Sequence, residues 1–419
     1  MAREMKHSGI EWIGEIPKEW KVIRGKYLFN VLNGFAFDSS LFTNENTYTP
    51  LIRIRDISNY ETEAYYMGDY SLDYVVKKGD VLVGMDGDFN VAKWKGRDAI
   101  LNQRVCKLHS FTDNYLPQYA YYVLPMLLKG KNDVTYATTV KHLSSNDIQN
   151  FSYLVPSLSE QQKIANYLDK VCGEVDEMIA LQEQMIEELK AYKQSVITEA
   201  VTKGLNPDAP MKDSGIDWIK ELPENWEVVT PKALFSLRRE KAIEGERQLT
   251  ASQQFGVIYQ DEYMQLTGTK VVTVMKDFDI LKHVEAGDFV ISMRSFQGGL
   301  EYSENTGSIS SAYVMLIPNL EYVHPKFYRW LFKSVCYINA LQSTSNMVRD
   351  GQAMRYSNFA QVPLYIVPLK EQQSIASYLD TKCAEIDALI AIKQAKIEEL
   401  KDYKKSIIYE YVTGKKEVV

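Results

Sequence analysis

Cysteine and histidine patterns that hold metals or disulfide frameworks are missing from this sequence. Its 419 residues include only four cysteines, Cys106, Cys172, Cys336 and Cys383, and no Cys-x-x-Cys pair. The five histidines are scattered and show neither the H-E-x-x-H motif nor a paired spacing. We therefore expect buried thiols, structural or surface histidines, and no metal site.

Long apolar runs are missing as well. No stretch approaches the roughly 18 apolar residues of a membrane span, and the first residues, MAREMK, lack the apolar core of a signal peptide. The composition, 45% hydrophobic and 25% charged, is typical of folded soluble proteins. We expect a cytoplasmic protein without membrane contact, and the length favours several domains over one core.

Motifs for nucleotide and cofactor chemistry are also absent. There is no G-x-x-x-x-G-K-[ST] phosphate loop, and the only string similar to a methyltransferase Asn/Asp-Pro-Pro-aromatic motif is Asn206-Pro207-Asp208, in a linker. Asp86 and Asp88 in MDGDF could hold a metal, but no nearby Glu-x-Lys completes a nuclease triad. We favour a turn that closes a strand here, and we predict that the chain is not itself an enzyme.

What the sequence does contain is a duplication. Residues Met5–Phe29 recur at Met211–Phe235 with 14 of 25 positions identical, and Glu160–Tyr192 recur at Glu371–Tyr403 with 19 of 33 identical. The second pair is related by an offset of 211 residues. Between these anchors the two halves diverge. The chain therefore contains two copies of one unit. The repeated anchor segments of the copies are similar, and the segments between the anchors differ.

The second repeated segment has the periodicity of a long helix. Apolar or small residues recur at alternating steps of four and three, and the copy keeps the same phase. The series is Leu168, Cys172, Val175, Ile179, Gln182, Ile186, Leu189, Lys193 and Val196, with the copy Leu379, Cys383, Ile386, Ile390, Lys393, Ile397, Leu400, Lys404 and Ile407, and its polar exceptions fall in the same two layers of both copies. An ordinary amphipathic core helix is the alternative, but the periodic stretch exceeds the usual length of about 8 to 20 residues. We favour a two-helix coiled coil.

The segments before the helices are rich in Tyr, Val, Ile and Phe and are interrupted by Gly-Asp and Asn-Gly turns. A shorter helical stretch follows in each, near Pro117–Lys129 and Pro325–Lys333. We predict two mixed α/β domains with an internal pseudo-twofold relation. The predicted boundaries are Met1–Pro156 for the first domain, Ser157–Leu205 for the first helix, Asn206–Pro368 for the second domain and Leu369–Val419 for the second helix.

The net charge of -7 argues against a wholly basic nucleic-acid binder, but DNA binding needs only a local basic face. Residues 90–107 hold five basic side chains against the single acid Asp98. Such a cluster suits phosphate contacts, and its Asn, Gln and Arg side chains can read base edges; a solvated hairpin tip is the alternative. The candidate DNA-binding residues of the first half are Arg53, Arg55, Asn90, Lys93, Lys95, Arg97, Asn102, Gln103, Arg104 and Lys107.

The second half offers comparable but weaker polar and basic sets. The candidates are Arg238, Arg239 and Lys241, then Arg294 with Gln297, and Arg349 with Gln352 and Arg355. Glu240, Glu244 and Glu246 nearly neutralise the first set. Each set alone is therefore a weak signal.

Two repeated strings resemble a known family. SGIEWIGEIPKEW and SGIDWIKELPENW, together with VPSLSEQQKIANYLD and VPLKEQQSIASYLD, are similar to the specificity subunits of type I restriction-modification systems. The resemblance spans nearly the whole chain. It implies that each half is a target recognition domain followed by a helix, that the two helices pair antiparallel, and that each domain reads one part of a split site in double-stranded DNA.

The resemblance also implies partners. Two adenine methyltransferase (modification) subunits would dock on the helices, and two ATP-driven restriction and motor subunits would join that core. We expect no cofactor on this chain, because S-adenosylmethionine, ATP and Mg2+ would bind the partner subunits. The residues expected to pair the helices and support docking are Leu168, Val175, Ile179, Ile186, Leu189, Leu379, Ile386, Ile390, Ile397 and Leu400.

Two other functions stay open at this point. The chain could be a scaffold that binds only proteins, which DNA binding by the assembled complex would exclude. It could also be a fragment of a self-contained restriction or methyltransferase enzyme, against which the missing catalytic motifs argue.

Overall fold

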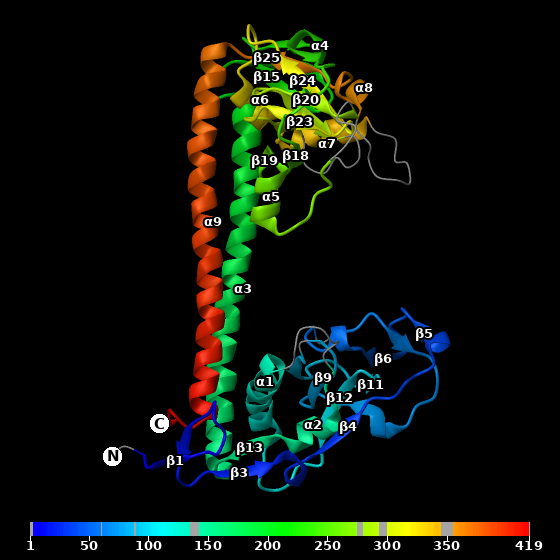
Figure 1. Ribbon diagram of the computed structural model, residues 1–419, viewed down its shortest axis with the longest axis vertical. Helices are drawn as coiled ribbons and strands as arrows, with labels where there is room; N and C mark the ends of the chain where they lie inside the picture. The colour runs from blue at the N-terminus through cyan, green and yellow to red at the C-terminus, as the bar shows by residue number, and fades with distance from the viewer. Residues whose placement is uncertain are drawn as a thin grey trace. The chain divides into compact units, whose positions relative to one another are not determined.

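The structure is a computed structural model, which describes residues 3–59, 61–87, 89–134, 142–274, 280–292, 300–344 and 355–418. The chain divides into two compact units (Figure 1). Unit 1 consists of residues 1–182 and 395–419, and unit 2 of residues 183–394. Among the described residues, no helix is both long enough and apolar enough to span a bilayer.

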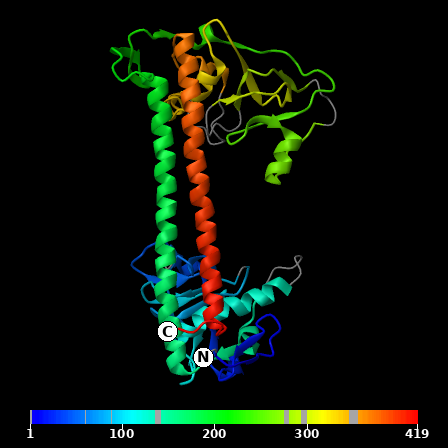
Figure 2. The same ribbon diagram turned by 90° about the vertical axis from the view of Figure 1, so that its left-hand side faces the viewer.

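Two long helices take part in both units. Helix α3 is Leu158–Lys203 and helix α9 is Leu369–Val412. The beginning of α3 lies beside the end of α9 in unit 1, and the end of α3 lies beside the beginning of α9 in unit 2 (Figures 1 and 2). The predicted architecture of mixed α/β halves with a pair of long antiparallel helices is confirmed.

Equivalent ion pairs join the two helices in each unit. In unit 1 the Lys404 Nζ atom lies 2.6 and 2.7 Å from the carboxylate oxygens of Asp176. In unit 2 the Lys193 Nζ atom lies 2.7 Å from both carboxylate oxygens of Asp387. The two lysines occupy the same polar layer of the heptad pattern, so the charge that interrupts the apolar seam has a partner on the facing helix. Such a pair favours one register over its alternatives.

The apolar seam of the helices continues into the core of each unit. In unit 1, Leu168 and Cys172 belong to the same buried cluster as Trp20 and Tyr119. In unit 2, Leu379 and Cys383 belong to the same cluster as Trp226 and Phe327. Each helix pair is therefore packed against the domain next to it, which is where most helix stability comes from.

Unit 1 contains a four-stranded antiparallel sheet in the order β4-β12-β9-β10 and a five-stranded sheet in the order β5-β7-β6-β11-β8. In the second sheet, β6 and β11 are parallel. The strands are β1 Met5–His7, β2 Glu15–Pro17, β3 Lys21–Arg24, β4 Asn30–Asn33, β5 Phe42–Thr43, β6 Thr49–Ile52, β7 Tyr65–Tyr66, β8 Val75–Val76, β9 Val81–Gly84, β10 Val91–Lys93, β11 Ala99–Leu101, β12 Val105–His109 and β13 Ser152–Val155. The helices are α1 Pro117–Val134 and α2 Ser145–Asn150, with short 3-10 turns at Gly25–Tyr27, Ser39–Leu41, Ile54–Asp56 and Leu72–Tyr74.

Unit 2 repeats this scaffold, with a four-stranded antiparallel sheet in the order β17-β24-β21-β22. Its strands are β14 Met211–Ile216, β15 Ile219–Pro223, β16 Glu227–Val229, β17 Phe235–Leu237, β18 Leu249–Ser252, β19 Gly256–Tyr259, β20 Lys282–Val284, β21 Phe289–Ser292, β22 Glu301–Tyr302, β23 Gly307–Ile309, β24 Tyr313–Pro318 and β25 Leu364–Ile366. Its helices are α4 Pro231–Leu234, α5 Gln260–Thr267, α6 Pro325–Leu331, α7 Val335–Ser343 and α8 Tyr356–Phe359. The strand order is retained in the middle of the halves, where the sequences align only loosely.

A buried glutamine at the start of each long helix joins that helix to its domain. Gln161 is fully buried; its Nε2 atom donates to the carbonyls of Asn114 (2.9 Å) and Pro156 (3.0 Å), and its Oε1 atom accepts from the Leu116 amide (2.9 Å). Gln161 and the three backbone groups thus satisfy one another without water.

Gln372 makes the equivalent contacts in unit 2. Its Nε2 atom donates to the carbonyls of Tyr322 and Val367, both at 2.7 Å, and its Oε1 atom accepts from the His324 amide at 2.7 Å. The preceding glutamates also correspond, since Glu160 accepts from the Trp20 indole and Glu371 from the Trp226 indole. The repeated Glu-Gln-Gln string is therefore the anchor that orients each helix on its domain.

Candidate DNA interface

Three turns of unit 1 meet at one edge of its strands. The parallel strands β6 and β11 end side by side, and β9 ends opposite the start of β12, with Gly84 paired to Val105. The turns 53–56 and 102–104, and the described residues of 85–90 (85–87, 89 and 90), follow these ends. Backbone hydrogen bonds join them: the Asn102 amide donates to Ile52 and the Met85 amide to Arg104. We call the three turns together the turn edge.

Six of the sequence-predicted residues lie on the turn edge. They are Arg53, Arg55, Asn90, Asn102, Gln103 and Arg104. Arg53 is half-buried and is held by the carboxylate of Asp56, with its Nε atom 2.8 Å from Oδ2. Asn102 shapes its own turn, because its Oδ1 atom accepts from the Gln103 amide at 2.8 Å. Arg55, Asn90, Gln103 and Arg104 are the exposed members.

Asp86 organises the exposed end of this edge. Its carboxylate binds two basic side chains, with Oδ2 3.3 Å from Arg104 Nη1 and Oδ1 2.7 Å from His142 Nδ1. Asp86 is in a turn after β9, and Gly87 has a φ of 75°, a conformation that glycine adopts without strain. Asp88 lies outside the described residues. Among the residues that are described, no group of three or more metal-ligating side chains is found.

The remaining basic residues of the segment 90–107 lie elsewhere. Strand β10 runs antiparallel to β9 and pairs Lys93 with Val81, at the opposite end from Gly84. There the Lys93 Nζ atom lies 3.1 Å from Asp169 of α3. The cluster that is contiguous in sequence is therefore divided between two ends of one sheet.

Lys107 and Arg97 are occupied by partners within the unit. The Lys107 Nζ atom lies 2.6 Å from the Val75 carbonyl and 3.3 Å from Asp80, and the Lys107 side chain is only 13% exposed. The guanidinium of Arg97 donates to the Asn46 carbonyl at 2.7 Å. These two side chains brace loops in this structure.

Lys93 and Lys95 line a groove of about 1150 Å³ between the sheet and the long helices of unit 1. Its other walls come from α1, with Tyr121, Met126 and Lys129, and from α3 and α9. The groove combines an apolar and aromatic floor with several lysines. Its position beside α3 and α9 separates it from the turn edge.

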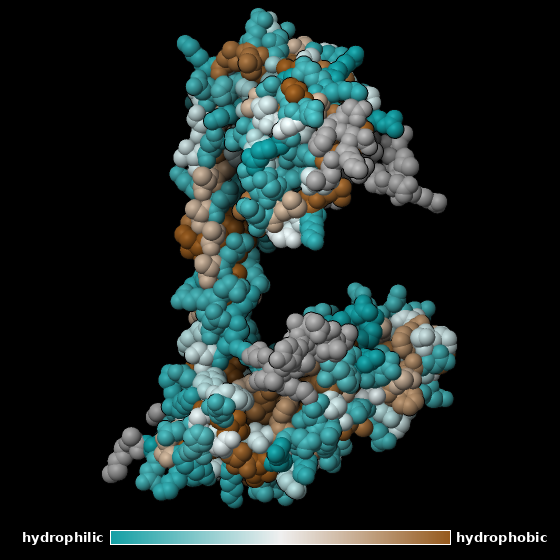
Figure 3. Space-filling view, in the orientation of Figure 1, coloured by the Kyte–Doolittle hydropathy of each residue, from teal (hydrophilic) through white to brown (hydrophobic). Residues whose placement is uncertain are grey.

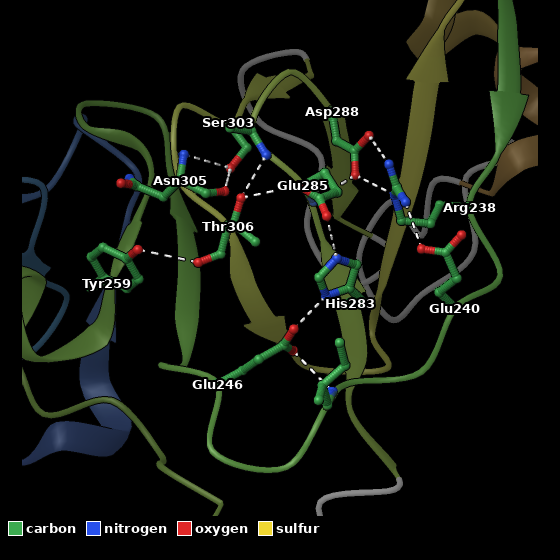
Figure 4. Close-up of polar contacts among 12 residues, drawn as sticks. Arg238, Glu240, Glu246, Tyr259, His283, Glu285, Asp288, Ser303, Asn305 and Thr306 are labelled. Carbon is green, nitrogen blue, oxygen red and sulfur yellow. Dashed lines mark hydrogen bonds and ion pairs between the residues drawn. The ribbon is translucent and has the colours of Figure 1, made fainter.

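In unit 2, Arg238 is an internal brace (Figure 4). Its Nε atom lies 2.6 Å from Asp288 Oδ2 and its Nη1 atom 2.6 Å from Glu240. The hydrogen bond that Arg238 donates to the Asp288 carboxylate raises the pKa of Arg238, and the side chain is only 10% exposed. Arg239, Lys241 and Arg355 are exposed. The remaining candidates, Arg294, Gln297, Arg349 and Gln352, lie outside the described residues.

His283 forms a second buried polar group beside this brace (Figure 4). Its Nδ1 atom lies 2.6 Å from Glu246 and its Nε2 atom 3.0 Å from Glu285, which also accepts from the Thr306 hydroxyl. Burial alone would lower the pKa of His283, but the two carboxylates outweigh it and raise the pKa above the usual value. His283 was expected only to be a scattered structural or surface residue. The spacing of His283 and Glu285 on alternate residues was a weak signal, whereas Glu246 is distant in sequence.

The turn equivalent to 102–104 carries different side chains in unit 2. It joins β23 to β24, and the Tyr313 amide donates to the Ser310 carbonyl as the Val105 amide donates to that of Asn102. Asn102-Gln103-Arg104 in unit 1 corresponds to Ser310-Ser311-Ala312 in unit 2. The second turn has no sequence signal of its own, because only the strand pairing reveals the correspondence.

Each long helix also exposes an apolar pair away from its seam. Met178 and Leu181 of α3 are each 53% exposed in unit 1, and Leu389 and Ile392 of α9 are 47% and 63% exposed in unit 2. The pairs are related by the offset of 211 residues. Figure 3 shows hydrophobic surface along this stretch of α9. Exposed apolar positions that are duplicated suggest a surface that each half uses in the same way.

Comparison with known proteins gives consistent matches over both halves. A family model described as the type I restriction modification DNA specificity domain matches residues 17–191 and 223–402. The type I restriction enzyme EcoBI specificity subunit of Escherichia coli is 29% identical over 410 residues, which cover 93% of this chain and 84% of that protein. The type I restriction enzyme MjaVIII specificity subunit of Methanocaldococcus jannaschii is 22% identical over 411 residues, 96% of this chain and 93% of that protein.

A solved structure has the same fold. That structure concerns the complex assembly and conformational transition of the type I R-M system. One of its chains is similar to this chain, with a TM-score of 0.67 at 17% identity. The similarity covers 95% of this chain and 99% of that one.

Proposed function

The chain belongs to the family of type I restriction-modification specificity subunits, which recognise DNA sequence, and we propose that each of its halves reads one part of a split site. The observation that supports this most is the pair of equivalent turns. One scaffold presents Asn102-Gln103-Arg104 in unit 1 and Ser310-Ser311-Ala312 in unit 2. Side chains of these types bind base edges, and different side chains on one frame would read different bases.

The reading domains proposed here are Met1–Pro156 and Asn206–Pro368, with the helices Ser157–Leu205 and Leu369–Val419 as connectors. Exposed basic residues, such as Arg55 in the first domain and Arg239 and Lys241 in the second, would contact phosphates and position the domains. Buried or paired residues such as Arg238 would instead support the loops.

The duplicated apolar pairs on the helices would receive two methyltransferase subunits, one in each half. An exposed pair at i and i+3 on a helix suits helix-to-helix packing. S-adenosylmethionine would bind the methyltransferase subunits, and ATP with Mg2+ the two restriction and motor subunits that join them. This chain would supply sequence recognition and a frame for assembly.

A domain exchange tests the reading of half-sites. Residues 206–367 are replaced by the equivalent segment of a relative with a different target, and methylated adenines are mapped in cells that also express the methyltransferase subunit. We expect one half of the methylated site to change and the other to remain. A change in both halves would contradict independent reading, and an unchanged site would contradict reading by unit 2.

Introducing charge into the exposed apolar pairs of the helices tests docking. The variants are Met178→Asp with Leu181→Asp on α3, and Leu389→Asp with Ile392→Asp on α9. Each should reduce the methyltransferase bound per chain from two copies to one, measured by the mass of the complex in solution, and the combined variant should bind none. Glu183→Ala, on the exposed surface of α3, is the control and should keep both copies. Two bound copies in the combined variant would refute this docking surface.

A protein-only scaffold is the alternative function that these experiments also address. If the assembled complex binds duplex DNA no better than the methyltransferase subunit alone, the scaffold would be the better description. Methyl transfer by the isolated chain with S-adenosylmethionine would instead indicate a self-contained enzyme.

A further inference from the structure

Asp86, Arg104 and His142 form a polar group in unit 1, in which one carboxylate contacts two basic side chains. The two oxygens of the Asp86 carboxylate hold one basic side chain each, at 2.7 Å for His142 Nδ1 and 3.3 Å for Arg104 Nη1. The side chain of Asp86 is 27% exposed, whereas His142 is 53% and Arg104 58% exposed. The carboxylate is thus sheltered, and the two basic groups face solvent.

The hydrogen bond to Asp86 determines what His142 can offer. A carboxylate only accepts hydrogen bonds, so the Nδ1 atom of His142 is the donor to Asp86, and in the neutral form of the imidazole the Nε2 atom is then an acceptor. Arg104 has only donors, and part of its guanidinium is not used by Asp86. One carboxylate therefore sets a donor and an acceptor side by side.

Backbone hydrogen bonds hold together the three segments that carry Asp86, Arg104 and His142. The three segments are joined by backbone hydrogen bonds from Met85 to Arg104 (3.0 Å) and from Leu143 to Met85 (2.7 Å). Exposed ion pairs contribute little to stability. A sheltered carboxylate with two exposed partners is therefore better explained by orientation of the partners than by stabilisation of the loop.

A donor beside an acceptor matches one purine edge. In the major groove adenine presents the acceptor N7 next to its N6 amino donor, whereas guanine presents the two acceptors N7 and O6. We propose that Arg104 and His142, oriented by Asp86, read an adenine in the half-site that belongs to unit 1. Arg104 donates to N7 and the Nε2 atom of His142 accepts from N6. This inference rests on the proposed function and names residues that determine specificity at that site.

The test uses the assembled methyltransferase complex in cells and maps the methylated adenines. The first variant, Arg104→Ala, should relax one position of the first half-site by on the order of tenfold in discrimination and leave the second half-site unchanged. His142→Arg replaces the acceptor by a donor and should shift the preference at that position from adenine to guanine. His142→Gln restores an acceptor and should keep adenine. Lys21→Ala, an exposed lysine of unit 1 outside the turn edge, is the control.

The outcomes separate the inference from the proposed function. If the wild-type complex methylates without sequence preference, the proposed function fails. If it methylates a split site and Arg104→Ala and His142→Arg leave that site unchanged, the base-reading role is wrong and the function stands. Weaker methylation at all sequences with unchanged preference would make these residues phosphate contacts, and would also overturn the inference. Reading of another base at that position by the wild type, with the same response to both variants, would overturn the assignment to adenine.

Discussion

Replacing the buried glutamine at the start of a long helix should loosen that helix from its domain. Gln161→Ala removes three hydrogen bonds and leaves the Leu116 amide and the carbonyls of Asn114 and Pro156 without their partner. At a net contribution of about 1 kcal/mol for each hydrogen bond, the loss is about 3 kcal/mol. This is a large fraction of the roughly 5–15 kcal/mol that stabilises a folded domain.

The effect should be visible as a thermal shift and as a local loss of protection. For a unit of this size 1 kcal/mol corresponds to roughly 2–4 °C, so the transition of unit 1 should fall by about 6–12 °C. Hydrogen exchange of the Leu116 amide should accelerate, because its acceptor is gone. Gln372→Ala should do the same for unit 2 and for the His324 amide.

The neighbouring glutamine provides the control. Gln162 is exposed and its side chain donates to that of Asn166 at 2.8 Å, with no further hydrogen bond among the described residues, so Gln162→Ala should change stability by less than about 0.5 kcal/mol. If Gln161→Ala behaved like Gln162→Ala, or if the Leu116 amide stayed protected, the anchoring role of the Glu-Gln-Gln string would be refuted.

Three further predictions concern charge and thiol chemistry. The raised pKa of His283 means that its contribution to the stability of unit 2 is complete below about pH 6.5 and is lost as the pH rises through the raised value. His283→Gln should remove this part of the pH dependence in denaturant titrations, and an identical profile would exclude the role. A double-mutant cycle on Lys404 and Asp176 should give a coupling of about 0.2–1 kcal/mol that weakens in high salt; a larger, salt-independent coupling would contradict an exposed pair. Burial raises the pKa of Cys106 to about 12, so iodoacetamide at pH 8 should modify the partly exposed Cys336 first, and equal rates would be inconsistent with this packing.

Much of the fold could be predicted because its signals are local. The heptad pattern of α3 and α9 follows from the periodicity of neighbouring residues, and the long helices lie where that pattern predicts them. The duplication indicated two similar halves. Each half contains a four-stranded sheet, and the strand orders β4-β12-β9-β10 and β17-β24-β21-β22 are equivalent.

The candidate interface could be predicted only in part, because it depends on strand register. Lys93 and Arg104 are close in sequence and were therefore grouped together. Strand β10 runs antiparallel to β9, however, so Lys93 lies at the opposite end of the sheet from the turn that holds Arg104. Conversely, His142 joins Asp86 across 56 residues of chain.

The sequence by itself determined the repeat, the long helices and the family, because each of these is written in local spacing and residue type. The tertiary structure decided which polar residues share a carboxylate and which are exposed. His283 between Glu246 and Glu285, and Arg104 beside His142, are contacts between segments that only strand pairing brings together. A side chain's availability for DNA depends on whether a partner from elsewhere in the fold already holds it, and no local pattern encodes that.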